Sequence, residues 1–344
     1  MKALAIKYRP KTFDDVVEQG VVKKILQEQL KTKTHQNTYL FTGGAGTGKT
    51  TCARIFANEI NNHEGNPIEI DAASNNGVEN VRDIIDNAKF KALDAAYKVY
   101  IIDECHMLST GAWNAMLKLI EEPPAQTVFI FCTTDPQKIP ATIISRVQRY
   151  DFQRITYQSV VDRLKQILDW ENETNQEDII YDMEALGYIA KLADGGMRDA
   201  ITLLDKCLSY DLNLSVKTVV ESLGTVDYHI MFDLTGGIID AKADEVVKII
   251  EEAHRSGIDL KQFMKLYMNF LLDAYKYFLI GDFEYLQIPS TYEEILNGYT
   301  DEEYQDIKEL LDEVIRLNAD IKWEPNPKPL IEATLILWCQ EVEQ

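Results

Sequence analysis

The chain has 344 residues, more than a single hydrophobic core usually holds, which predicts two or three domains. Its 46% hydrophobic and 26% charged residues exclude an intrinsically disordered protein. The net charge of −21 does not exclude a local contact with nucleic acid, because residues 1–150 carry 18 basic and 17 acidic side chains while the remainder carries 17 and 39.

No stretch approaches the roughly 20 apolar residues of a membrane span, and the first residues lack the apolar core of a signal peptide. The five cysteines are scattered and form no CxxC pair. We therefore expect a reduced, cytoplasmic protein with no disulfides and no membrane partner.

Up to residue 152, short apolar runs alternate with stretches of helical spacing. Strands are expected at 38–43, 67–74, 98–104 and 127–134, and helices at 50–60, 78–90 and 111–122. Strands that are apolar at every position are typical of a parallel sheet covered by helices on both faces. The pattern predicts an α/β domain over residues 1–154.

Beyond Phe152 the spacing predicts helices only. They are expected at 160–173, 183–193, 197–209 and 216–224, and again from about 228 to the end, where loops at 283–292 and 323–329 interrupt them. We therefore predict a small helical domain over 155–223 and an all-α C-terminal domain over 224–344.

The stretch GGAGTGKT (43–50) fits the phosphate-loop pattern GxxxxGK[ST], and it lies between an expected strand and an expected helix, as that motif requires. Backbone N–H groups and the helix N-terminus would hold the phosphates of ATP. Lys49 would bind the β- and γ-phosphates, and the Thr50 hydroxyl would bind Mg²⁺. The predicted nucleotide-binding residues are Gly43, Gly44, Ala45, Gly46, Thr47, Gly48, Lys49, Thr50 and Thr51.

The stretch VYIIDECHML (99–108) has three interpretations: the acidic box of a helicase, half of a metal site, or the acidic end of a strand that serves a nucleoside triphosphate. The helicase interpretation requires a Ser-Ala-Thr stretch and a second α/β domain, and neither is found. The metal interpretation requires two more ligands, but His63 and Cys132 are isolated.

With a phosphate loop nearby, the third interpretation is favoured. Asp103 would hold Mg²⁺ through water, and Glu104 would polarise the attacking water. Cys105 and His106 are expected to pack beneath the site as ordinary residues.

Seven blocks of the sequence resemble the gamma/tau subunit family of the bacterial DNA polymerase III clamp loader, a branch of the AAA+ ATPases. The blocks are KYRPKTFDDVVEQ (7–19), the phosphate loop, IDAASNNGVENVRDI (70–84), KVYIIDECHMLS (98–109), NAMLKLIEEPP (114–124), TTDPQKIPATIISR (133–146) and GGMRDAITLLD (195–205). The resemblance is dense over residues 5–225, and it implies that the small helical domain is a lid and the C-terminal domain a collar for oligomerisation.

The resemblance also implies roles for individual residues. Thr134 matches the first sensor of the γ-phosphate, Arg146 matches the arginine finger that reaches the ATP site of a neighbouring subunit, and Arg198 matches the second sensor. Arg149 lies close enough to Arg146 to share its role. The residues that match the adenine pocket are Tyr8, Arg9, Pro10 and Val17.

The sequence departs from the family at several positions. The interval 58–67 holds no cysteine where relatives carry a zinc module, so no zinc is expected. Glu18 replaces a glycine, and Val147 replaces a cysteine. Where relatives often have basic residues after DAAS, this chain leaves Arg82 as the expected DNA phosphate contact.

The resemblance implies an ATPase motor subunit of a sliding-clamp loader, in a compact form that is phage-encoded or from a divergent bacterium. Its expected partners are the sliding clamp, the other loader subunits in a pentamer with several copies of this chain, and primer–template DNA. Two alternatives stay open: an ATP-binding structural subunit of the same loader, and another AAA+ DNA-processing ATPase.

Overall fold

The computed structural model describes residues 3–175, 178–223, 228–283 and 286–342. It divides into two compact units, residues 1–212 and 213–344. The first unit contains the α/β domain and three of the four helices expected to form the lid, while the fourth, expected at 216–224, falls in the second unit. The predicted domain boundaries after residues 154 and 223 are not tested by this division and stay predictions.

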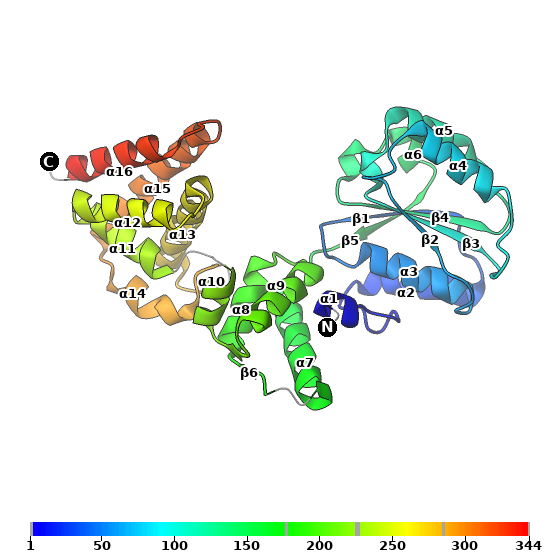
Figure 1. Cartoon of the computed structure of the whole chain (residues 1–344), viewed down its shortest axis with the longest axis horizontal. Helices are drawn as coiled ribbons and strands as arrows, with labels where there is room; N and C mark the ends of the chain where they lie inside the picture. The colour runs from blue at the N-terminus through cyan, green and yellow to red at the C-terminus, as the bar shows by residue number, and fades with distance from the viewer. Residues whose placement is uncertain (1–2, 176–177, 224–227, 284–285, 343–344) are drawn as a thin grey trace. The chain divides into compact units, whose positions relative to one another are not determined.

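The first unit is built on a five-stranded parallel sheet with the strand order β2-β3-β4-β1-β5. Its strands are β1 (Thr38–Gly43), β2 (Ile68–Asp71), β3 (Lys98–Asp103), β4 (Thr127–Thr133) and β5 (Gln148–Phe152). Because all strands run the same way, the phosphate loop after β1 opens at the same sheet edge as the ends of β3 and β4 (Figure 1).

Successive strand residues point to opposite faces of the sheet, and helices cover both faces (Figure 1). Tyr39 and Phe41 of β1 pack on one face with α2 (Gly20–Thr32) and α3 (Lys49–Ile60). Leu40 packs on the other face. That face is covered by α4 (Val78–Ala88), α5 (Thr110–Glu121) and α6 (Ala141–Ile144). The predicted parallel α/β fold is confirmed.

Several elements were not predicted, and one is shorter than expected. α2 was missed, and so was β5, which alternates polar and apolar residues and is recognised by its pairing with β1. The second strand ends at Asp71 rather than Ser74, because the Asp71 carboxylate accepts a hydrogen bond from Ala73 N at 2.9 Å and turns the chain.

The remaining helices of the first unit pack together with the N-terminal α1 (Leu4–Lys7). They are α7 (Tyr157–Asn175), α8 (Met183–Leu192) and α9 (Met197–Tyr210), each within a few residues of its predicted range. The prediction of helices only beyond Phe152 is wrong in detail, because the two-residue strands β6 (Ile180–Tyr181) and β7 (Asn213–Leu214) occur there.

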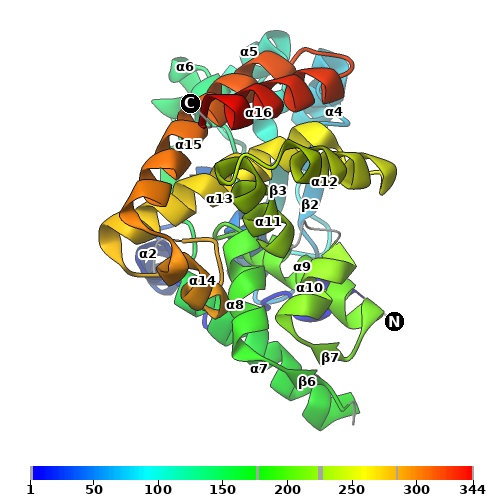
Figure 2. The ribbon, with the colours of Figure 1, turned by 90° about the vertical axis from the view of Figure 1, so that its left-hand side faces the viewer.

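Apart from β7, the second unit is helical as predicted, and its core is formed by aromatic and aliphatic residues, most of them on α11 to α16. The helices are α10 (Val216–Leu223), α11 (Tyr228–Ile239), α12 (Ala243–Arg255), α13 (Leu260–Ile280), α14 (Glu293–Gly298), α15 (Asp301–Ile321) and α16 (Lys328–Val342). Within it, α13 packs along α15 and α12 along α16 (Figures 1 and 2).

The two predicted loops separate helices of the second unit. The loop at 283–292 ends in a short 3₁₀ turn, Ser290–Tyr292, and residues 284–285 lie outside the described residues. The loop at 323–329 is shorter than predicted, because α16 begins at Lys328 and Pro329 occupies its first turn, where proline is tolerated.

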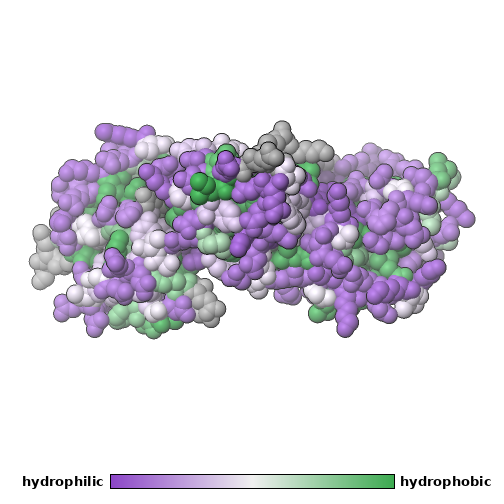
Figure 3. Space-filling model, turned by 90° about the horizontal axis from the view of Figure 1, so that it is seen from below, coloured by the Kyte–Doolittle hydropathy of each residue, from purple (hydrophilic) through white to green (hydrophobic). Residues whose placement is uncertain are grey.

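The surface drawn in Figure 3 is mostly hydrophilic, and hydrophobic residues gather there only in separate patches. Among the described helices, none is both long enough and apolar enough to cross a membrane.

Gly43 allows β1 and β5 to approach each other. It has φ +148°, and a Cβ atom there would collide with the carbonyl oxygen of Phe152 and lie 2.9 Å from the Phe152 Cβ. We predict that Gly43→Ala lowers the free energy of unfolding by about 2 kcal/mol, measured as a lower urea midpoint. Gly44→Ala is the matched control, because a Cβ there meets only Thr47 Cγ2 at 3.7 Å. Equal midpoints for the two variants would contradict this explanation.

Candidate functional site: a phosphate-loop cavity

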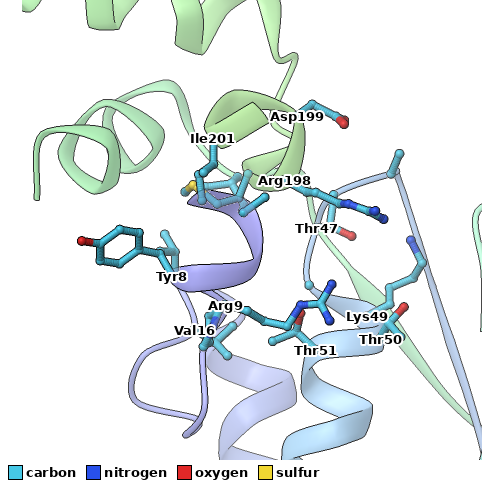
Figure 4. A pocket seen from close by; sticks show the side chains of 18 of the residues that line it. Tyr8, Arg9, Val16, Thr47, Lys49, Thr50, Thr51, Arg198, Asp199 and Ile201 are labelled. Carbon is cyan, nitrogen blue, oxygen red and sulfur yellow. The ribbon is translucent and has the colours of Figure 1, made fainter. Parts of the chain in front are cut away.

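A cavity of about 240 Å³ opens where the carboxyl ends of β1 and β3 face α1 and α9 (Figure 4). Fifteen of the predicted site residues line it: Tyr8, Arg9, Pro10, Val17, Ala45, Gly46, Thr47, Gly48, Lys49, Thr50, Thr51, Asp103, Glu104, Thr134 and Arg198. Of the other phosphate-loop residues, Gly43 and Gly44 contribute their carbonyl oxygens to the environment of Lys49.

Lys49 and Thr50 begin α3 directly after the phosphate loop. The Lys49 ammonium donates hydrogen bonds to the carbonyl oxygens of Gly43 at 2.9 Å and Gly44 at 2.7 Å, and the residue is only 6% exposed. The Thr50 hydroxyl donates to Asp103 Oδ2 at 2.9 Å. These contacts bring a cation and a hydroxyl of α3 and a carboxylate of β3 to one end of the cavity.

Burial lowers the pKa of Lys49, although the negative charges of the nearby Glu104 and Asp103 counteract this effect. An anion in the cavity would offset the cost of burying the ammonium. The Lys49 ammonium therefore fits the phosphates of a nucleoside triphosphate. The Thr50–Asp103 pair fits a Mg²⁺ ion whose other ligands would be phosphate and water oxygens.

Glu104 is joined to the end of β4. Its Oε2 atom accepts a hydrogen bond from Thr134 Oγ1 at 2.9 Å and lies 3.2 Å from His106 Nδ1. Cys105 is buried as predicted, and burial raises the pKa of its thiol. The His106 ring is mostly buried beside the Glu104 carboxylate, and the expectation that it is an ordinary packing residue rather than a metal ligand stays a prediction.

The N-terminal segment forms one wall of the cavity and is fixed to the helices of the lid. The Lys7 ammonium pairs with the buried Glu171 carboxylate at 2.7 Å. The Tyr8 ring stacks on Trp170, with 5.7 Å between ring centroids, and the Arg163 guanidinium lies 5.0 Å from the Trp170 ring. In Figure 4, Tyr8 and Lys49 lie on opposite sides of the group of labelled residues.

Glu18 and Gln19, which follow this segment, both bind the part of the chain that leads into α7. Gln19 also binds the phosphate loop. The Gln19 amide donates to Gln153 O at 2.7 Å and to Thr47 O at 3.4 Å. Glu18 has φ 54°, a left-handed conformation that favours glycine, which is the residue expected there from the family pattern. Its carboxylate instead accepts hydrogen bonds from Thr156 N at 3.1 Å and Thr156 Oγ1 at 2.5 Å.

The two predicted arginines lie in different places. Arg198, in the first turn of α9, lines the cavity and extends toward Thr47 (Figure 4). Arg146 lies outside the cavity, where its Nε donates to Glu121 Oε1 at 2.6 Å and its Nη1 to Thr142 O at 2.8 Å. Arg146 therefore does not line the cavity of its own chain, and its role as an arginine finger stays a prediction.

Comparisons with known proteins identify the relatives of this chain. It is 37% identical, over an alignment 369 positions long, to the DNA polymerase III subunit tau of Bacillus subtilis, and it is 36% identical over 280 positions to that of Escherichia coli K12. It is 32% identical to the DNA polymerase III subunit gamma of Buchnera aphidicola subsp. Schizaphis graminum, with 78% of each chain covered.

The chain belongs to the DNA polymerase III gamma/tau family. The family profile described as "DNA polymerase III clamp loader subunit, ATPase lid domain" matches residues 159–210, and the one described as "DNA polymerase III, delta subunit" matches residues 67–156. The Bacillus and Escherichia alignments include 100% and 75% of this chain but only 64% and 43% of those relatives.

Solved structures of the RuvB Holliday junction branch migration motor of Thermotoga maritima share the fold. One aligns with a TM-score of 0.51 over 78% of this chain and 91% of RuvB, at 19% sequence identity. An identity this low shows the fold alone.

The last predicted site residue, Arg82, lies exposed on α4 of this gamma/tau family member. Acidic residues flank it on the same helix, namely Glu79, Asp83 and Asp86, so α4 alone does not form a basic patch.

In the described parts of the chain, no three His, Cys, Asp or Glu side chains gather as a metal site. The expected absence of zinc stays a prediction.

Several lining residues were not predicted from the sequence: Ala5, Val16, Ile155, Arg163, Met197, Asp199 and Ile201. Of these, Met197, Asp199 and Ile201 lie in the same sequence block as Arg198. Their position beside a predicted site residue could have indicated that they line the cavity. Arg163 lies on a helix with no motif, and nothing in its local sequence distinguishes it from a surface arginine.

We predict that Lys49→Ala weakens binding of a fluorescent ATP analogue in the presence of Mg²⁺ at least tenfold, because the variant loses the buried cation that faces the phosphates. Lys138→Ala is the control, since Lys138 is 62% exposed and paired with Asp135 away from the cavity. Titration of fluorescence anisotropy measures both dissociation constants. Equal affinities for the two variants would show that Lys49 does not hold phosphate.

Proposed function

We propose that this chain is an ATPase motor subunit of a sliding-clamp loader. In this function, ATP binding orders an assembly that opens the clamp, and primer–template DNA then triggers hydrolysis. The observation that carries the proposal is the single cavity that brings together Lys49, Asp103, Glu104 and Arg198, in a chain of the gamma/tau family.

The cavity supports hydrolysis as well as binding. The water oxygen would bond to the γ-phosphorus while the bond to the β–γ bridging oxygen breaks and leaves its electron pair on ADP. Mg²⁺ held by Thr50 and Asp103 would neutralise charge on the phosphates, and Glu104 would accept the water proton. Thr134 and Arg198 would respond to the γ-phosphate from two sides of the cavity.

Arg146 would act in the ATP site of a neighbouring subunit. Its anchoring to Glu121 and Thr142, both outside the cavity of its own chain, supports a role in trans. An arginine supplied by a neighbour increases hydrolysis only in the assembled complex, so hydrolysis would depend on the geometry of assembly.

The proposed partners are the sliding clamp, other loader subunits in a pentamer with several copies of this chain, and primer–template DNA. Arg82, with Lys89 and Lys91, would contact DNA phosphates. Lys89 is paired with Asp86 at 2.7 Å, so Arg82 is the stronger candidate of the three. The helical second unit would provide the oligomerisation collar.

The alternative of a structural subunit that binds ATP without turnover is less well supported. Such a subunit needs neither an intact acidic pair nor a cation at the phosphate loop, and this chain combines Lys49, Thr50, Asp103 and Glu104 in one cavity. No observation favours a branch-migration function, because the likeness to RuvB concerns the fold alone.

The decisive experiment measures steady-state ATP hydrolysis with primer–template DNA and the candidate clamp. We predict that Lys49→Ala and Arg146→Ala each lower the rate at least 100-fold, and that mixing the two variants restores activity, because the Lys49→Ala chain still supplies its arginine to the intact site of the other.

Arg149→Ala tests in the same assay whether the neighbouring arginine shares the role of Arg146. Arg149 is a similarly exposed arginine, but it pairs with Asp151 of its own strand at 2.7 Å. It should retain the wild-type rate. Wild-type hydrolysis that stays at background with DNA and clamp present would refute the motor function and favour the structural subunit.

A further inference from the structure

Glu104 adopts a backbone conformation that non-glycine residues rarely take. Its φ of 45° and ψ of 43° lie in the left-handed region. The conformation turns the chain from the end of β3 directly into the 3₁₀ turn Cys105–Met107. A residue held in a strained conformation at the edge of a cavity is a feature that often accompanies a functional role.

Three groups converge on one oxygen of the Glu104 carboxylate. Thr134 Oγ1 lies at 2.9 Å, Thr134 N at 3.4 Å and His106 Nδ1 at 3.2 Å, all from Oε2. The other oxygen, Oε1, accepts no hydrogen bond from the described residues. The Glu104 side chain, which lines the cavity, is therefore held through Oε2 and not through Oε1.

The His106 side chain is mostly buried and also contacts Thr133. It is 13% exposed, and its Nδ1 lies 3.1 Å from Thr133 Oγ1, a hydroxyl that also accepts a hydrogen bond from Asp135 N at 3.0 Å. An ionised carboxylate can only accept hydrogen bonds, so His106 can donate to Glu104 Oε2 only when Nδ1 carries a proton, which lies within reach of both Thr133 Oγ1 and Oε2. His106 does not line the cavity and therefore reaches a nucleotide only through Glu104.

We propose that His106 is a positioning residue for ATP hydrolysis, which holds Oε2 of Glu104 so that Oε1 faces the attacking water. This inference rests on the proposed ATPase function. The water oxygen bonds to the γ-phosphorus as the bridging P–O bond breaks, and one water proton passes to Oε1 and then to the phosphate product. A carboxylate already fixed in this orientation loses no further rotamer freedom when it accepts that proton.

The test compares two substitutions of His106. His106→Asn keeps an amide N–H near the position of Nδ1, whereas His106→Leu keeps an apolar side chain but has no donor. We expect His106→Leu to lower kcat about tenfold with unchanged KM and unchanged affinity for the fluorescent ATP analogue, and His106→Asn to recover most of kcat. His63→Leu, at an exposed histidine outside the cavity, should match the wild type.

A second measurement separates positioning from packing. In a Glu104→Gln background, His106→Leu should lower kcat no further, because His106 acts through the carboxylate. A histidine that only fills space would instead change the thermal midpoint and the nucleotide affinity, and both His106 variants would be affected alike. That result, or an unchanged kcat in His106→Leu beside an active wild type, overturns this inference alone. An inactive wild type overturns the proposed ATPase function as well.

Discussion

The arrangement of this chain depends on the parallel pairing of β1 with β4 on one side and β5 on the other. Parallel strands all end at the same sheet edge, so the pairing determines which groups surround the phosphate loop. Gly43 is essential to it, because any side chain there would meet the backbone of Phe152. The backbone hydrogen bonds of the sheet therefore bring together the phosphate loop, the acidic end of β3 and Thr134. Their side chains need not bond to one another for this.

The cavity is closed from its other side by segments that are far apart in the sequence. The tip of the phosphate loop approaches the start of α9 so closely that the Cβ of a residue replacing Gly46 would lie 2.9 Å from the Cα of Gly196, and Met197 N donates to Gly46 O at 3.1 Å. A nucleotide that moves the phosphate loop would therefore also act on Arg198 at the start of the same helix. This backbone contact provides a direct physical route from phosphate binding to the lid.

Much of the fold and part of the site could be predicted from the sequence. Continuous apolar strands such as 98–103 leave little choice but a buried parallel sheet, and the glycine spacing of 43–50 identifies a phosphate loop. By contrast, β5 was missed because its burial comes from its neighbour β1 rather than from its own composition. Arg146 was singled out only through the family resemblance, since its local sequence resembles that of any surface arginine.

The position of His106 could not be predicted for a different reason. Sequence spacing cannot show that Glu104 takes a left-handed conformation, and that turn is what brings the histidine back to the carboxylate. Similarly, the stacking of Tyr8 on Trp170 joins two segments with no pattern in common. Contacts of this kind depend on tertiary packing, which local propensity does not encode.

The attachment of the N-terminal segment has a consequence for how the chain is made. Lys7 binds Glu171, 164 residues later, and Leu4 N binds Asp205, 201 residues later. During synthesis the first residues leave the ribosome long before these partners exist, and domains generally fold from the N-terminus as they emerge. The sheet can thus form early around β1, whereas the wall containing Tyr8 must wait until α9 has been translated. The nucleotide cavity is therefore the last part of the first unit to become complete.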